Sequence, residues 1–223
     1  IFHSKLAKKN KSEVLTVMFV DIVSYTKTTA NLDRENFNYL HDVFDTICHK
    51  FFKEHEGKVI KKIGDAFLVT FKSATEAVLC GINLQNSFYE YNQKHRKQDP
   101  LKIRVALHSG EILHRHGDIY GDAVNTAARV EGITKANHVV FSEPVYAAMN
   151  KNEMDYIYLG AKKLKGLQRP LKVFRVKTKM DEILDRKKRT RKFFNKIKRK
   201  IVGVVVLGVV VIAIFLLVKY LFG

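Results

Sequence analysis

The feature of this sequence that most constrains its fold is an uncharged run near the C-terminus. Residues Ile201 to Val218 include 18 consecutive positions without a charged side chain. An α-helix rises 1.5 Å per residue, so a helix of this length approaches the ~30 Å thickness of a bilayer's hydrocarbon core. A buried helix in a soluble domain usually keeps a polar face, which this run lacks. We therefore predict one C-terminal transmembrane helix over residues 201–222.

Positive charge is concentrated immediately before this run. Residues 162–200 hold 18 Lys and Arg against 3 Asp and Glu, whereas residues 1–161 hold 21 against 19. Loops rich in Lys and Arg stay on the cytoplasmic side of a membrane, so the preceding domain is predicted to be cytoplasmic. We expect residues 179–200 to form a basic juxtamembrane helix that contacts anionic lipid. Since the charge is local, no nucleic-acid partner is expected.

The cysteines and the start of the chain add two smaller expectations. Cys48 and Cys80 both fall on apolar helix faces, which favours buried free thiols in a reducing compartment. The chain opens on Ile1 rather than on a methionine. Residues 1–13 are accordingly predicted to be an N-terminal tail that has lost an upstream part.

Hydrophobic periodicity in the first half indicates alternating strands and helices. Residues 14–22 form a nearly continuous apolar run, typical of a central strand buried on both faces. Residues 37–51 place large apolar side chains three and four apart, as an amphipathic helix does. Residues 58–71 indicate two strands joined at a Gly-Asp turn. Ser73 and Glu76 form a capping box that begins the next helix.

The second half indicates a strand at 101–113, a helix at 119–133 and a strand at 138–141, then a short helix at 146–149 and closing strands at 157–164 and 171–176. The order β-α-β-β-α-β followed by further elements is that of a ferredoxin-like split βαβ fold. We therefore predict an α/β (α+β) domain over residues 14–178, with elements added at its C-terminal end.

Two carboxylates occupy unusual positions in this pattern. Asp21 ends an apolar strand, and Asp65 lies in the turn of the predicted hairpin. A carboxylate among apolar neighbours is costly unless a positive group neutralises it. Oxygen ligands on rigid backbone suit Mg²⁺ or Mn²⁺, which commonly share their coordination with substrate phosphates. Taken alone, the two residues are better explained as an ordinary turn residue and a capping residue.

Five short blocks, in a fixed order, decide between these interpretations. They are FVDIVSYT at 19–26, KKIGDAFLVTF at 61–71, IRVALHSGEI at 103–112, GDIYGDAVNTAARVEG at 117–132 and LKGLQRP at 164–170. Together they resemble the signature motifs of class III nucleotidyl cyclase catalytic domains. Tyr25 replaces the usual Phe of the first motif and Ala106 the usual Gly of the third. One block alone would be weak, but five in register make the resemblance specific.

The resemblance implies a site for two divalent cations, Mg²⁺ or Mn²⁺. Asp21 and Asp65 match the family's metal ligands, with the backbone carbonyl of Ile22 assisting. Arg104 and Lys165 match positions that bind the β- and γ-phosphates of the substrate, although other basic residues lie near both in the sequence.

The resemblance also implies how the base is chosen. Lys61 and Asp118 match the pair that in adenylyl cyclases binds adenine N1 and the 6-amino group. Guanylyl cyclases usually carry Glu and a Cys or small polar residue there. Lys62 is adjacent, so a register shifted by one residue is an alternative, but counting four residues back from Asp65 selects Lys61.

Asn125 and Arg129 complete the predicted site. They lie four residues apart, and hence on one face of the helix expected to begin near Tyr120. In the family, the Asn orients the ribose and the Arg stabilises charge on the transition-state phosphate. The planar, permanently charged Arg fork suits an oxyanion.

The resemblance as a whole predicts a membrane-anchored adenylyl cyclase that converts ATP to cyclic AMP and pyrophosphate. In the family one subunit supplies the counterparts of Asp21, Asp65 and Arg104, and its neighbour supplies the base, ribose and transition-state residues together with the counterpart of Lys165. This chain holds both sets, so a homodimer with two shared sites is expected. The alternatives are a cyclase for another base, and a silent membrane-tethered sensor or nucleic-acid-binding module that uses residues 162–200.

Overall fold

The computed structural model describes residues 11–23, 34–96, 100–195, 197–199 and 202. The predicted membrane span therefore lies almost entirely outside the described residues. Within the described part of the chain, no helix has both the length and the hydropathy needed to cross a bilayer. The chain divides into two units, Ile1–Thr178 and Lys179–Gly223, and each is described by itself.

The first unit is built on a sheet whose first four strands have the predicted split βαβ arrangement. They are β1 (Lys11–Ile22), β2 (Lys58–Ile63), β3 (Ala66–Phe71) and β4 (Ile103–Arg115), in the spatial order β2-β3-β1-β4. Each neighbouring pair is antiparallel, and β3 lies between β2 and β1. This order confirms the ferredoxin-like core that the sequence predicts.

Four further strands extend this core. The short strand β6 (Val139–Ser142) pairs in parallel with β4, which makes the sheet mixed. β8 (Leu171–Val176) and then β7 (Tyr156–Lys162) continue the sheet by antiparallel pairing. β5 (Asp118–Tyr120) pairs with the far end of β4 and forms a hairpin with it. These are the elements that the sequence predicts after the core, except for β5.

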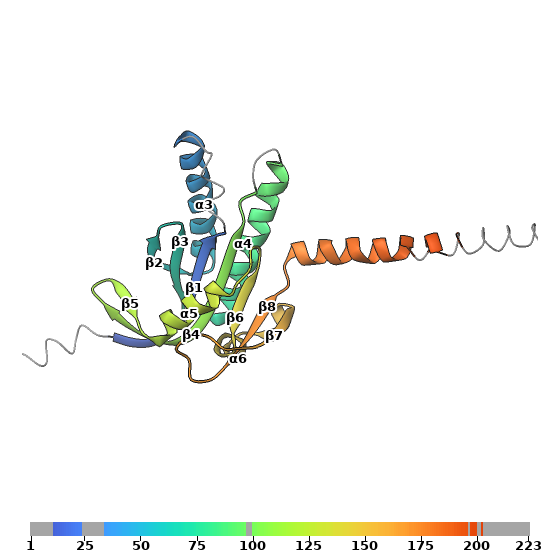
Figure 1. Cartoon of the computed structure of the whole chain (residues 1–223). Helices are drawn as coiled ribbons and strands as arrows, with labels where there is room; N and C mark the ends of the chain where they lie inside the picture. Colours follow the sequence, from blue (N-terminus) through green and yellow to red (C-terminus); the bar gives the residue numbers. More distant parts are fainter. Residues whose placement is uncertain (1–10, 24–33, 97–99, 196, 200–201, 203–223) are drawn as a thin grey trace, which may run out of the picture. The chain divides into compact units, whose positions relative to one another are not determined.

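Two long helices cover one face of the sheet. Figure 1 shows α3 (Arg34–Glu54) and α4 (Ala74–Lys94) side by side. Their aromatic side chains pack against those of the strands, as in the stacked rings of Phe44 and Phe67. The Ser73 side chain accepts a hydrogen bond of 3.2 Å from the Glu76 backbone N–H, which confirms the N-terminal half of the capping box. Cys48 and Cys80 are buried free thiols in this core, as predicted.

A third helix, α5 (Asp122–Gly132), packs on the opposite face. Its buried residues Ala123 and Ala127 share a core cluster with Leu15 and Val17 of β1. Strand β1 is therefore covered on both faces, as its continuous apolar run predicts. A short helix, α6 (Glu143–Ala148), and a 3₁₀ turn (Lys151–Glu153) connect β6 to β7.

Two helix boundaries differ from the prediction. The helix expected to begin near Tyr120 begins instead at Asp122, because residues 118–120 pair with β4 as strand β5. Gly121 makes the change of direction with φ 134°, and a Cβ there would lie 3.0 Å from the Glu111 carbonyl oxygen. The short helix predicted at 146–149 begins earlier, at Glu143, with a proline in its first turn.

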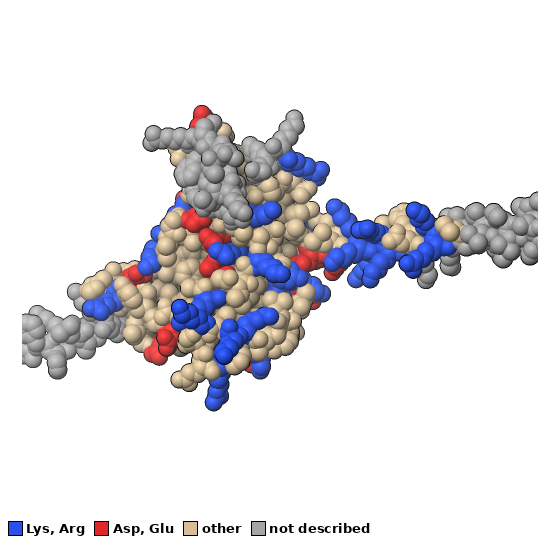
Figure 2. All heavy atoms as spheres, in the orientation of Figure 1, with Lys and Arg blue, Asp and Glu red and all other residues tan. Residues whose placement is uncertain are grey.

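The second unit is helical over residues 179–195, within the segment where a helix is predicted. Figure 2 shows Lys and Arg side chains crowded along this helix. Large apolar side chains are also exposed on it, and Phe193 and Phe194 are each 62% exposed.

Candidate active site

The sheet register places the two predicted metal-binding carboxylates beside each other. Asp21 lies opposite Ala66 of β3 on one side and opposite Arg104 of β4 on the other. Asp65 precedes Ala66 in the two-residue turn after β2, where Gly64 adopts φ 61°. Ile22, whose carbonyl is the third predicted ligand, follows Asp21 as the last residue of β1. The β2–β3 hairpin turn and the end of β1 thus meet at one edge of the sheet.

Arg104 joins Asp21 to a carboxylate that the sequence does not single out. The Arg104 Nε donates to Asp21 Oδ2 at 2.7 Å, and Nη2 lies 2.5 Å from the same oxygen. Nη2 also lies 2.5 Å from Oε1 of Glu131, near the end of α5. Buried Oε1 makes no hydrogen bond of good geometry despite this close approach. One guanidinium is therefore shared between two carboxylates.

Burial raises the pKa of Asp21, whose side chain is almost fully covered, although the Arg104 hydrogen bond and charge oppose the shift. Burial likewise raises the pKa of Glu131, and Asp21 and Asp65 add repulsion. Asp65 also repels Asp21. Three carboxylates and one guanidinium at this edge leave an excess of negative charge, which a cation would relieve.

This charge excess fits the divalent cations that the resemblance implies. Among the residues that the structure describes, no three His, Cys, Asp or Glu side chains are arranged to hold a metal by themselves. Asp21 and Asp65 would thus need further oxygen ligands, such as the Ile22 carbonyl, waters and substrate phosphates. Mg²⁺ in phosphate-transfer sites is usually held by one or two carboxylates in this way.

The predicted base-reading residues are in direct contact. Lys61 of β2 and Asp118 of β5 lie 57 positions apart, yet Lys61 Nζ donates to Asp118 Oδ2 at 2.5 Å. The other carboxylate oxygen accepts a hydrogen bond of 2.8 Å from the Ile119 backbone N–H. The Lys61 hydrogen bond lowers the pKa of Asp118. A donor and an acceptor are therefore held side by side and remain partly exposed.

The neighbouring Lys62 has a different partner, which bears on the choice between the two lysines. Its Nζ donates to both carboxylate oxygens of Asp45 in α3, at 2.6 and 2.8 Å. It also lies 5.4 Å from the centroid of the Phe67 ring. Because successive residues of a strand point to opposite faces, Lys62 on the α3 side places Lys61 on the other side. The structure supports the register that selects Lys61.

Asn125 and Arg129 point away from the sheet of their own chain. Helix α5 buries Ala123, Thr126, Ala127 and Val130. With successive residues about 100° apart, Asn125 and Arg129 lie about 110–150° from the centre of this buried stripe. Asn125 is exposed. Asn125 and Arg129 share the face of α5 opposite its buried stripe, where Arg129 is half-buried, whereas Glu131 lies on the flank that reaches Arg104.

A glycine positions the loop that carries Lys165 against Arg129. Gly166 adopts φ 75°, and a Cβ there would lie 2.9 Å from Nη2 of Arg129. The Lys-Gly element is thus packed directly on the guanidinium. Lys165 itself is exposed. The structure brings Lys165 near Arg129 in the chain's own fold, on a different element from Arg104.

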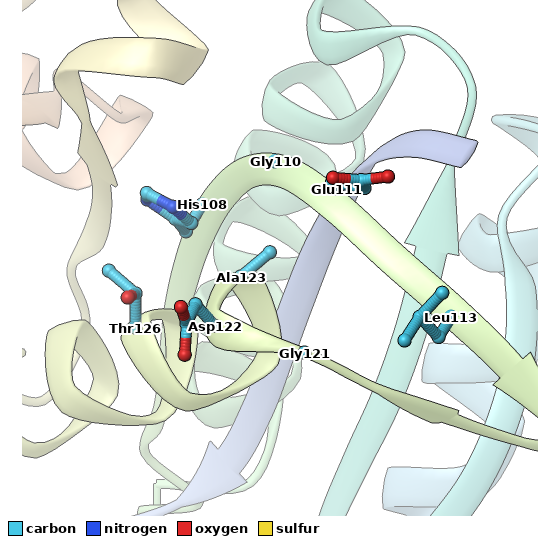
Figure 3. A pocket seen from close by; sticks show the side chains of 8 residues that line it. All are labelled: His108, Gly110, Glu111, Leu113, Gly121, Asp122, Ala123 and Thr126. Carbon is cyan, nitrogen blue, oxygen red and sulfur yellow. The ribbon is translucent and has the colours of Figure 1, made fainter. Parts of the chain in front are cut away.

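A cavity of about 360 Å³ lies between β4 and the start of α5. Figure 3 shows His108 of β4 near Asp122 and Thr126 of α5, with Glu111 and Leu113 farther along the strand. His108 Nδ1 lies 2.8 Å from Ser142 Oγ, and burial lowers the pKa of His108 to about 4. The imidazole is therefore neutral at neutral pH. None of the predicted site residues lines this cavity.

Sequence reasoning missed two residues that touch the predicted site. Glu131 follows Arg129 by two positions and looks like part of a polar helix end until the fold brings it to Arg104. Gly166 stands within a predicted motif, but only the structure shows that Arg129 packs on it. A glycine directly after a lysine, in a segment between two predicted strands, was the available signal for a backbone with positive φ.

The combination of this fold and these residues defines a nucleotide-cyclising domain, and comparison with known proteins agrees. The model of the adenylate and guanylate cyclase catalytic domain matches residues 7–198. The chain belongs to this family.

Two curated relatives illustrate this similarity. The serine/threonine-protein kinase pkn2 of Myxococcus xanthus is 34% identical over 165 residues, which are 74% of this chain and 20% of that protein. The receptor-type guanylate cyclase Gyc76C of Drosophila melanogaster is 25% identical over 162 residues, 65% of this chain and 10% of that protein. This chain thus spans a fifth or less of these two relatives.

Solved structures agree with the fold. The adenylyl cyclase CyaB from P. aeruginosa matches with a TM-score of 0.70 at 24% identity, over 76% of this chain and 96% of that one. The guanylyl cyclase Cya2 matches with a TM-score of 0.67 at 20% identity, over 76% and 94%. Because adenylyl and guanylyl cyclases share the fold, the choice of base depends on individual residues.

Proposed function

We propose that this chain is an adenylyl cyclase that converts ATP to cyclic AMP and pyrophosphate. The observation that carries the proposal is the contact between Lys61 and Asp118. On its Watson–Crick edge, adenine presents an acceptor at N1 and a donor at the 6-amino group. Guanine presents a donor at N1 and an acceptor at O6. A lysine and a carboxylate side by side match adenine and mismatch guanine, and sites built on such hydrogen bonds reject the wrong partner strongly.

The remaining residues fit the same reaction. The ribose 3′-oxygen attacks the α-phosphate in line, its proton is lost and the bond to pyrophosphate breaks. Two divalent cations bound at Asp21 and Asp65 would supply charge neutralisation and make the 3′-hydroxyl more acidic. Asn125 would orient the ribose, and Arg129 would stabilise the charge that develops on the transferring phosphate. Arg104 and Lys165 would bind the β- and γ-phosphates.

We propose that each site is shared between two copies of this chain. Asn125 and Arg129 face away from the sheet that carries Asp21, because α5 buries its opposite side against that sheet. A nucleotide held at Asp21 would meet these two residues most readily from a second chain. A symmetric dimer would then form two equivalent sites.

The base-reading proposal predicts a change of substrate preference. In the double variant Lys61→Glu with Asp118→Cys, both hydrogen-bonding roles that match adenine are removed. We expect kcat/KM for ATP to fall at least about a hundredfold, and far more than kcat/KM for GTP. Steady-state assays with each nucleotide measure the ratio.

The adjacent lysine provides a matched control. Lys62→Gln removes the ion pair with Asp45 on the other side of the hairpin, so the preference for ATP should stay unchanged. Wild-type preference in the double variant would show that Lys61 and Asp118 do not read the base, and loss of preference in Lys62→Gln would favour the shifted register.

We further propose that residues 201–222 anchor the chain in a membrane, with the cyclase domain in the cytoplasm. The uncharged run and the basic, exposed helix before it support this. After expression in cells, the full chain should stay in the membrane pellet through alkaline carbonate washing. A chain ending at Thr178, the boundary of the first unit, should not. Release of the full chain by carbonate would refute the anchor.

A further inference from the structure

Arg104 stands at the centre of an ion-pair arrangement with two carboxylates. Its guanidinium contacts Asp21 through Nε and Nη2, and Nη2 is also 2.5 Å from Glu131 Oε1. All three side chains are mostly covered, with exposed fractions of 28%, 11% and 20%. If Asp21 holds a divalent cation, the guanidinium and the cation compete for the same carboxylate. Two positive groups on one carboxylate repel each other strongly at low dielectric.

Glu131 is placed to resolve this competition. It comes from α5, which is fixed on the sheet by Ala127 and Val130, so its carboxylate does not depend on the strand end that carries Asp21. Its Oε1 is buried and already lies 2.5 Å from Nη2 of Arg104, so the guanidinium can pair with Glu131 without leaving its present position. It lies on the flank of the helix, away from the outward face of Asn125 and Arg129.

We propose that Glu131 is a positioning residue that takes over Arg104 when Asp21 binds a metal ion. In the structure described, Arg104 neutralises Asp21. With a cation on Asp21, the guanidinium pairs with Glu131 alone and stays at the edge of the site, where it meets the substrate phosphates. The inference rests on the proposed function, because it requires that Asp21 is a metal ligand and that phosphates enter beside it.

The proposal predicts that Glu131 acts on metal binding through Arg104. In Glu131→Gln the Arg104 guanidinium keeps only Asp21 as a charged partner. A cation that binds Asp21 must then displace the guanidinium, which has no second carboxylate to pair with. Mn²⁺ binding, followed by electron paramagnetic resonance in the presence of inorganic tripolyphosphate, requires neither turnover nor a base. We expect the half-saturating Mn²⁺ concentration to rise about tenfold in this variant, because one partner of a desolvated charge pair is lost.

A double-mutant comparison separates this role from the general effect of a negative charge. In an Arg104→Gln background there is no guanidinium to transfer, so Glu131→Gln should shift Mn²⁺ binding by less than about threefold. Equal shifts in both backgrounds, or no shift in either, would overturn the proposal. Glu54→Gln, which breaks an exposed ion pair with Lys50, should leave binding unchanged.

A second variant keeps the test decisive should Arg104→Gln fail to fold. Glu131→Asp retains the charge but withdraws the carboxylate by one methylene from Arg104. Transfer of the guanidinium predicts that Glu131→Asp weakens Mn²⁺ binding several-fold. If only the overall negative charge mattered, this variant would bind Mn²⁺ as the wild type does, and that result would overturn the proposal. If the wild-type chain and the Glu131 variants bind Mn²⁺ equally well, this inference alone is refuted. A wild-type chain that binds no Mn²⁺ with tripolyphosphate refutes the metal site of the proposed function as well.

Discussion

Replacing either Asp21 or Asp65 with asparagine is expected to lower the cyclase kcat by about a thousandfold, because each change removes a charged oxygen from the expected two-metal site. The fold should survive. In Asp21→Asn, Arg104 keeps its ion pair with Glu131, and Asp65 lies in a turn where an amide is tolerated. Cyclic nucleotide formation, measured beside far-UV circular dichroism and thermal unfolding, gives both results.

Asp45→Asn is the matched control for these two variants. It removes a partly exposed carboxylate that pairs with Lys62 on the α3 side of the sheet, outside the proposed site. Its activity should stay within about threefold of wild type, as for most partly exposed changes remote from a site. Substantial activity in a folded Asp21 or Asp65 variant would refute the assignment of that residue as a metal ligand.

Two inactive variants should restore activity when they are combined in one dimer. Asp65→Ala removes a metal ligand, and Arg129→Ala removes the charge that stabilises the transition state, so every site in either homodimer lacks one essential group. In a mixed dimer one site lacks both groups and the other is intact. With random pairing, half of the dimers are mixed, so the unfractionated mixture should reach about a quarter of the wild-type activity and the purified mixed dimer about half. Co-expression with two affinity tags, followed by assay of the doubly purified dimer, measures it.

A pairing within one set of residues provides the control. Asp65→Ala combined with Asp21→Ala damages both sites of a mixed dimer, since both residues belong to the same half of the site. This combination should remain inactive although its dimers form equally well. Recovery in this control, or no recovery with Asp65→Ala and Arg129→Ala in proven mixed dimers, would contradict a site shared between two chains.

The strands and helices that the sequence predicts correctly are those whose patterns are local. Residues 14–22 form a nearly continuous apolar run because β1 is covered by α3 and α4 on one face and by α5 on the other. The Gly64-Asp65 turn and the Ser73 cap use residue types that these backbone shapes favour. The order of these elements was enough to predict the first four strands.

The elements that the sequence does not predict depend on pairing between distant residues. Residues 118–120 carry no strong strand pattern, and they become β5 only because the end of β4 pairs with them. The same hairpin brings Asp118 to Lys61. A hydrophobic periodicity of 2 or 3.6 residues shows which side chains of a strand or helix are buried. It does not show which distant residues pair with one another, so neither contact could be predicted from it.

The site residues divide in the same way. Asp21 and Asp65 drew attention by their positions, at the end of an apolar strand and in a hairpin turn, and the motifs that contain them identified them as candidate metal ligands. Glu131 was not, because an acidic residue near the end of a helix is ordinary in sequence, and its role follows from a contact with Arg104 that spans 27 positions. The choice between Lys61 and Lys62 likewise required the contact of Lys62 with Asp45.

The most direct test of the central claim is to identify the products of the purified wild-type chain. The protein is incubated with ATP, GTP, CTP or UTP, in Mn²⁺ and separately in Mg²⁺, and the products are identified by mass spectrometry. The Lys61–Asp118 contact predicts cyclic AMP from ATP, with kcat/KM at least about a hundredfold above that for GTP. Faster formation of another cyclic nucleotide would contradict the assignment to adenine. A folded, dimeric protein that forms no cyclic nucleotide from any of the four would contradict catalysis altogether and favour a silent, membrane-tethered module.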